Sequence, residues 1–169
     1  MTGTFTVEQL RPIKDGMTIS RDAKMGQTTA VTFFSLGKDT SISQERYDVT
    51  SIYIGAKGTA DFLIGDLAKK EPVSDGDCLI VPGDTFSAPF IRPEETPSLF
   101  PVTMAQITEI IIKKETTMNS IVKSGEVMKL KDLISYEEGS IANLDVVSNG
   151  TMKFVLMAFD EGTGLTPHR

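Results

Sequence analysis

The chain has 169 residues, enough for one full domain or for one domain and part of another. It is 40% hydrophobic with a formal net charge of −6 and no basic run, which excludes the electrostatic footprint of a nucleic-acid-binding protein. Its single histidine, His168, excludes a Ser-His-Asp or Cys-His nucleophile, and a metal site built from two or three imidazoles, anywhere in residues 1–167.

The termini and the cysteine content indicate a compartment. The first residues have neither the basic segment nor the apolar segment of a signal peptide. No apolar run approaches the ~18–20 residues of a membrane span. Cys78 is the only cysteine, so no intrachain disulfide forms, and its apolar neighbours indicate a buried thiol. We therefore expect a cytoplasmic protein with no nucleic-acid or membrane partner.

The first part of the chain alternates short apolar segments with turn signals. The segments are rich in β-branched and aromatic residues, and Gly, Asp and Pro separate them. This pattern predicts an antiparallel sandwich or barrel. The expected strands are residues 28–35, 51–54, 59–64, 78–81, 85–91 and 107–113, with a turn at residues 55–58.

The remainder of the chain is organised differently. Residues 116–135 have few apolar side chains and are predicted to be a linker, with one short helical candidate at 129–135. Two further strands, 141–147 and 151–159, flank Asn149-Gly150, a strong hairpin signal. The predicted domains are therefore a β-barrel at 1–115, the linker at 116–135 and a hairpin within 136–169.

The glycines and prolines around these strands resemble the motifs of the cupin superfamily, the RmlC-like jelly rolls. Gly76-Asp-Cys-Leu-Ile-Val-Pro82 has the Gly-x5-Pro spacing of the second cupin motif, and the segment from Leu36 to Gly58 is similar to the first. Gly162 to His168 matches the Gly-x5-His start of another such motif. The resemblance covers about residues 28–92. It implies an all-β fold with one cupin jelly-roll barrel, a linker and a partial second cupin, the layout of a bicupin truncated within its second domain.

The resemblance also implies a metal site, with two His and a Glu from the first motif and a His from the second. Counted from the motif glycine and proline, the Glu position falls at Ser51, the first two His positions at or beside Gln44 and Arg46, and the last His position at Ser87. Serine and amide oxygens suit neither the softness nor the geometry of a divalent transition metal. We therefore expect no metal, no cofactor and no catalytic residue in the first barrel.

The same positions suggest a ligand pocket. Small barrels hold one ligand, and an arginine at the mouth suits a carboxylate or a phosphate. We therefore expect a small anionic ligand, bound by Gln44, Arg46, Ser51, Tyr53 and Ser87. The alternative is that these positions drifted after metal binding was lost and that the barrel is packed and structural.

Three classes of function remain. The sequence favours a non-catalytic cupin-fold module that binds a small molecule or serves a structural role. The second class is a metal-dependent bicupin enzyme, of the isomerase or oxygenase type, whose site lies in a second barrel beyond Arg169, where His168 would be a first metal ligand. The third is a metal-free enzyme in which Arg46, Tyr53 or a carboxylate transfers a proton. That class needs a carboxylate or a tyrosine with a shifted pKa inside the barrel.

Strand 151–159 is apolar on both faces, which predicts burial on both sides. An isolated hairpin is marginal in water, and open strand edges invite pairing with another chain. We therefore expect residues 141–159 to pack on the first barrel or, as the favoured partner, on a neighbouring subunit in a homodimer built partly by strand exchange.

Overall fold

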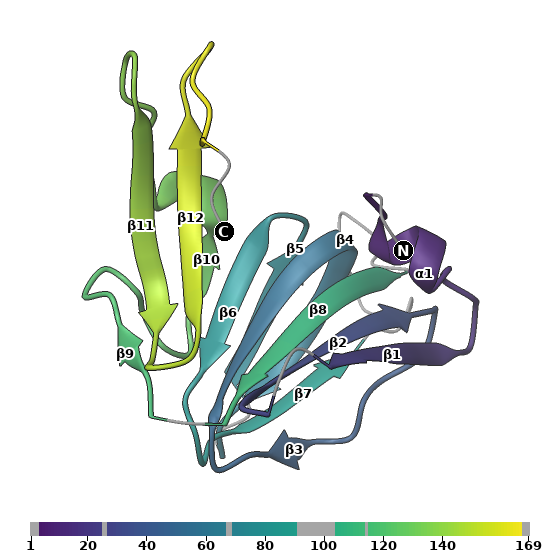
Figure 1. Ribbon diagram of the computed structural model, residues 1–169. Helices are drawn as coiled ribbons and strands as arrows, with labels where there is room; N and C mark the ends of the chain where they lie inside the picture. Colours follow the sequence, from purple (N-terminus) through teal and green to yellow (C-terminus); the bar gives the residue numbers. More distant parts are fainter. Residues whose placement is uncertain (1–3, 25–26, 67–68, 91–103, 114, 167–169) are drawn as a thin grey trace.

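A computed structural model describes residues 4–24, 27–66, 69–90, 104–113 and 115–166 (Figure 1). The described part of the chain is almost entirely β-structure, as the sequence predicts. In chain order its elements are α1 (Val7–Leu10), β1 (Thr18–Lys24), β2 (Thr29–Leu36), β3 (Glu45–Arg46), β4 (Thr50–Ile64), β5 (Lys69–Ser74), β6 (Asp77–Val81), β7 (Phe86–Phe90), β8 (Ala105–Ile112), β9 (Thr117–Met118), β10 (Val127–Lys129), the 3-10 helix η1 (Leu130–Asp132), β11 (Ile141–Ser148) and β12 (Lys153–Phe159).

The strands form the two walls of a jelly-roll barrel. One wall has the antiparallel order β1-β2-β8-β4-β6-β10, and the other is formed by β5, β7 and β3 beside the second half of β4. The long strand β4 therefore belongs to both walls. Its first half pairs with β6 and β8, and its second half pairs with β5 and β7.

The predicted turn at residues 55–58 is wrong, because β4 runs through it as one bent strand. The ladder with β8 shifts register between Gly55 and Lys57. A side chain at either flanking glycine would collide with backbone. A Cβ on Gly55 would lie 1.9 Å from the Ser74 carbonyl oxygen, and one on Gly58, whose φ is +66°, would lie 2.2 Å from the Met104 carbonyl oxygen. Glycine here permits a bend and a close approach between strands rather than a chain reversal.

The alternation of side chains along the strands creates two cores. Inside the barrel, Tyr53, Phe62, Leu79 and Ile107 belong to one cluster of buried residues. The strand residues next to these inward-facing ones point to the outer surface of the first wall. There Ile52, Cys78, Ile80 and Ile112 form a second cluster, and the Cys78 side chain is fully buried as predicted.

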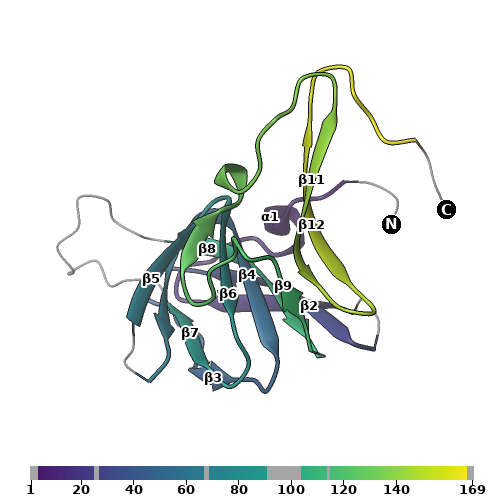
Figure 2. The ribbon, with the colours of Figure 1, turned by 90° about the vertical axis from the view of Figure 1, so that its left-hand side faces the viewer.

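The hairpin covers this outer surface. Val146 and Val147 of β11 are buried in the second cluster, and Phe154 and Leu156 of β12 pack against it. Figures 1 and 2 show β11 and β12 as a layer beside the barrel wall that extends beyond it. Of the two placements expected for residues 141–159, the single chain adopts packing on its own barrel. The predicted turn is confirmed: the Asn149 side-chain oxygen accepts hydrogen bonds from the backbone N–H of Thr151 at 2.8 Å and of Met152 at 2.9 Å.

The segment expected to be a linker, 116–135, is attached to the barrel. β9 pairs with β11, and β10 pairs with β6. Five side chains from this segment also join the second cluster: Met118, Val122, Met128, Leu130 and Leu133. The helical candidate at 129–135 contains only the single 3-10 turn η1.

Four strands of the barrel walls, β1, β3, β5 and β10, were not among the strands expected from the sequence. β1 has only two apolar residues, Ile19 and Ala23, beside three charged ones, and β5 contains two lysines and a proline. β5 pairs only with β4 among the described strands, and lysine and proline are common on such edge strands. Among the described residues, no helix is both long enough and apolar enough to span a bilayer.

Candidate functional site

Three polar side chains meet inside the barrel. Tyr53 comes from β4, Ser87 from β7 and Glu109 from β8, and each is at most 5% exposed. The Tyr53 and Ser87 hydroxyl oxygens lie 3.0 Å apart, so the contact joins the two walls. Tyr53 and Glu109 are direct partners in the β4–β8 ladder, and the Tyr53 hydroxyl hydrogen-bonds the Glu109 carboxylate. We call Tyr53, Ser87 and Glu109 the interior polar cluster.

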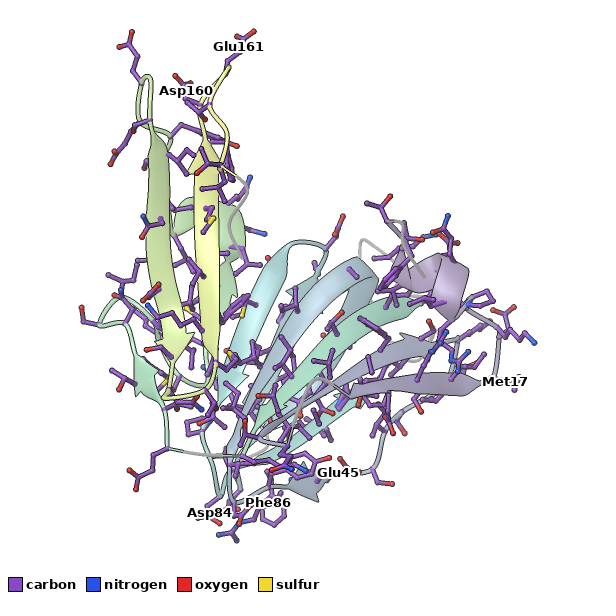
Figure 3. All side chains as sticks on the ribbon, in the orientation of Figure 1. Met17, Glu45, Asp84, Phe86, Asp160 and Glu161 are labelled. Carbon is purple, nitrogen blue, oxygen red and sulfur yellow. The ribbon has the colours of Figure 1, made fainter. Side chains whose placement is uncertain are left out.

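A second pair of residues connects this cluster to the β3 end of the barrel. The Tyr47 hydroxyl donates a hydrogen bond to the Glu45 carboxylate. Glu45 is the direct partner of Ser87 in the β3–β7 ladder. Both Tyr47 and Glu45 act electrostatically on the interior polar cluster. Figure 3 shows Glu45 near Phe86 and Asp84, where β3 meets β7. The Tyr47–Glu45 pair therefore lies at the solvent-exposed rim, next to the interior polar cluster.

Burial disfavours every ionised form in this region. It raises the pKa of Tyr53, and the nearby Glu109 carboxylate raises it further. The pKa of Tyr47 is raised in the same way, first by burial and then by its hydrogen bond to Glu45. Burial also raises the pKa of Glu109, against the opposing effect of the Tyr53 hydroxyl, and the charges of Glu45 and Asp22 add to the increase. The interior therefore offers several hydrogen-bond acceptors, and its surroundings disfavour the ionised forms of its own acidic groups.

The five residues predicted from sequence fall in two places. Tyr53 and Ser87 are in the interior polar cluster, and Ser51, 2% exposed, lies on the same face of β4 as Tyr53. Gln44 is exposed in the loop before β3, and Arg46 is exposed on β3. The Arg46 guanidinium lies 3.4 Å from the Asp84 carboxylate and 5.4 Å from the centre of the Phe86 ring. The structure therefore brings together the hydroxyl-bearing residues and leaves Arg46 at the rim.

Sequence reasoning missed Glu109. A signal was present, because strand alternation places Glu109 on the same face as Ile107, which is buried inside the barrel. A charged residue on such a face is seldom buried without a partner or a function. Tyr47 gave no comparable signal, because it lies in the loop between β3 and β4 and its contact with Glu45 follows from the path of that loop.

The described residues do not fit a resident transition metal. They contain no group of three or more His, Cys, Asp or Glu side chains placed to hold an ion. The interior polar cluster offers one carboxylate with a raised pKa and two hydroxyls, a poor donor set for iron, manganese, nickel or zinc. His168 lies outside the described residues.

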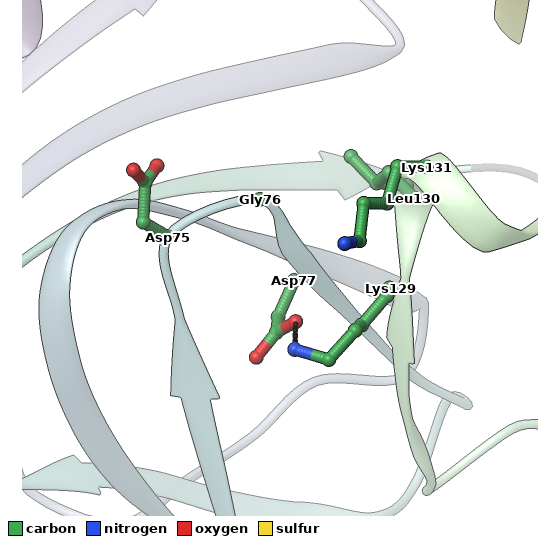
Figure 4. A pocket seen from close by; sticks show the side chains of 6 residues that line it. All are labelled: Asp75, Gly76, Asp77, Lys129, Leu130 and Lys131. Carbon is green, nitrogen blue, oxygen red and sulfur yellow. Dashed lines mark hydrogen bonds and ion pairs between the residues drawn. The ribbon is translucent and has the colours of Figure 1, made fainter.

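A cavity of about 260 Å³ lies elsewhere, where the β5–β6 turn meets β10 and η1 (Figure 4). The 7%-exposed Asp77 side chain accepts a hydrogen bond from the Ser74 backbone N–H at 3.0 Å and from Lys129 at 3.2 Å. These contacts close the β5–β6 turn and join β10 to β6, so they stabilise the fold.

The layers and the strand order define a jelly-roll barrel. A cupin 2 conserved barrel domain protein from Leptotrichia buccalis has a similar structure, with a TM-score of 0.77 and 19% sequence identity; the match covers 97% of this chain and 68% of that chain. A cupin superfamily protein from Desulfitobacterium hafniense has a TM-score of 0.55 at 16% identity over 68% of this chain and 94% of its own. A conserved protein of unknown function from Streptococcus pyogenes has a TM-score of 0.56 at 19% identity, covering 68% of this chain and 90% of its own.

These similarities establish the all-β cupin jelly-roll fold. At this level of sequence identity, a shared fold does not show that two proteins have the same function. No family model matches the sequence, and no curated protein matches it significantly. The function must therefore be argued from the site.

Proposed function

We propose that the chain is a non-catalytic cupin-fold module that binds a small molecule inside its barrel. The interior polar cluster is the observation that carries this proposal. Its three side chains come from three strands and meet inside the barrel. Buried polar groups cost stability compared with apolar groups of similar shape, so a purely structural barrel gains nothing by keeping a carboxylate there.

The charges around the cluster favour one class of ligand over another. The Glu109 carboxylate lies within the field of Glu45 and Asp22, so an anion entering the barrel is repelled. The carboxylate accepts hydrogen bonds, and the two hydroxyls both donate and accept them. We therefore propose a ligand that presents hydrogen-bond donors, such as a polyol or a small amine.

The small anionic ligand that the sequence predicts, held by Arg46, would bind at a different position from a ligand in the interior polar cluster. Arg46 is at the rim, where its guanidinium is already engaged by Asp84 and Phe86. An anion there would compete with the Asp84 carboxylate and would not touch the interior polar cluster. Binding at the rim and binding in the interior therefore depend on different residues.

A ligand screen by thermal shift separates the two positions. Polyols, small amines, carboxylates and phosphates are tested on wild type, Glu109→Gln and Arg46→Ala, with far-UV circular dichroism as a check of folding. The proposal expects stabilisation by polyols or amines that is lost in Glu109→Gln and kept in Arg46→Ala. Stabilisation by anions alone, lost only in Arg46→Ala, would move the site to the rim. An absence of hits would favour a purely structural barrel.

One observation favours a second candidate, a metal-free enzyme. A buried carboxyl with a raised pKa, hydrogen-bonded to a tyrosine, is a plausible general acid or base. Hits from the screen are incubated with the protein and followed by NMR. Conversion that Glu109→Gln abolishes would replace the binding module by this enzyme.

The bicupin alternative of the isomerase or oxygenase type rests on a further observation. The match to the Leptotrichia buccalis chain leaves about a third of that chain outside it. In this alternative a metal site would lie in a second barrel. The gene sequence past Arg169, together with the intact mass and the elemental analysis of the cellular protein, tests it. About one iron, manganese, nickel or zinc per chain would support the alternative against the metal-free module.

A further inference from the structure

One strand of the hairpin has a free edge. The three-stranded sheet has the order β12-β11-β9, and β11 is the only described strand that pairs with β12. The hairpin extends beyond the barrel, and Asp160 and Glu161 lie at its far tip (Figures 1 and 3). No described strand pairs with this side of β12, and unpaired backbone N–H and C=O groups on a strand edge can pair with another chain.

The exposed apolar side chains of the hairpin follow this edge. Val155, Met157 and Phe159, which we call the apolar stripe, alternate with the inward-facing Phe154 and Leu156. Met157 is 47% exposed and Phe159 is 41% exposed. On the same face, the β11 partners of Met157 and Val155 are polar: Asn143 and Asp145. The partner of Phe159 is the half-buried Ile141, so polar residues flank the apolar stripe at Met157 and Val155.

The two ends of β12 carry opposite charges. Lys153 begins the strand, and Asp160 and Glu161 follow its last residue. An antiparallel copy related by a two-fold axis at Met157 places Val155 opposite Phe159 and brings Lys153 towards the acidic residues that follow the strand, Asp160 and Glu161. Lys153 forms a 2.8 Å ion pair with Asp145 of its own chain, yet its side chain is 64% exposed and accessible to a second carboxylate. Lys153, Val155, Met157 and Phe159 alternate along β12, so they share one face of the sheet.

We propose that β12 is a self-complementary docking strand and that two copies of the chain pair through it in this register. The pairing joins two three-stranded sheets into one, satisfies both free edges and covers both apolar stripes. It specifies the partner and the register of the homodimer expected for residues 141–159, and it does not depend on ligand binding inside the barrel.

Light scattering on the full chain tests the assembly. Wild type should have twice the 18.4 kDa mass of one chain. Met157→Asp places two carboxylates together at the two-fold axis and should give a monomer. Asn143→Asp is the matched control, because it adds the same charge on the same face one strand further from the edge, and it should remain dimeric. A monomeric wild type, or equal masses for the two variants, would overturn the proposal and leave the apolar stripe to some other partner or segment.

Cross-linking tests the register without relying on a disruptive variant. Directly opposed residues of an antiparallel pair have Cβ atoms about 4.5–5.5 Å apart. Under mild oxidation Met157→Cys should form an intermolecular disulfide, because the two introduced thiols meet at the axis. Val155→Cys should not, because its two copies are about 13 Å apart along the strands. The natural Cys78 is fully buried and does not interfere. Equal cross-linking of both variants, or none in either, would refute this register.

Discussion

Tyr53→Phe is the sharpest test of the interior polar cluster. The substitution keeps the ring and its contact with Phe62, whose ring centre is 4.8 Å away. It removes the hydroxyl that lies 3.0 Å from the Ser87 hydroxyl and that hydrogen-bonds Glu109. The change is therefore confined to polar contacts in a space that is almost closed to water.

The expected cost follows from those contacts. A neutral hydrogen bond contributes about 1 kcal/mol net, and a buried polar group left without its partner costs about 1–3 kcal/mol. Tyr53→Phe should therefore lower the free energy of unfolding by about 2–4 kcal/mol. In a chain of this length each kcal/mol lowers Tm by about 2–4 °C.

Urea unfolding followed by far-UV circular dichroism measures the loss. Ser87→Ala serves as the second variant of a double-mutant cycle, because the double variant removes both hydroxyls and leaves neither partner orphaned. Its destabilisation should be smaller than the sum of the two single effects by about 1 kcal/mol. If Tyr53→Phe lies within about 0.5 kcal/mol of wild type, the range of an ordinary surface substitution, the buried hydrogen bonds described here do not stabilise the barrel.

Two further predictions concern Glu109 and the bend of β4. The pKa of the Glu109 carboxyl is raised from its ordinary value of 4.5, so above about pH 4.5 the native state holds more protons than the unfolded state and wild-type stability falls as the pH rises through this window. Glu109→Gln removes this dependence, and its stability relative to wild type should increase from about pH 4.5 upward in urea titrations; a pH-independent difference would contradict the raised pKa. Gly58→Ala should cost more than Gly125→Ala in the same measurement, because both glycines have positive φ but only at Gly58 would a Cβ meet backbone, at 2.2 Å. Equal losses would show that close approach does not fix the bend.

The sequence by itself determined what depends on local periodicity and turn chemistry. Alternation and β-branched residues located β2, β6, β7 and β8 to within one or two residues, and Asn149-Gly150 located the hairpin. The apolar run after Cys78 predicted its burial, and the motif spacing placed ligand positions at Ser51 and Ser87, both of which are buried. Each of these properties depends on residues close together in the chain.

Only the tertiary structure decided what depends on pairing between distant strands. The bend of β4 follows from the approach of Ser74 and Met104 to its glycines. Glu109 meets Tyr53 and Ser87 because β8 pairs with β4 in one particular register. A shift of one residue would turn Glu109 out of the barrel. The hairpin packs on its own barrel because the outer faces of β4, β6 and β8 together present an apolar surface. That surface is assembled from segments that the sequence alone does not show to be neighbours.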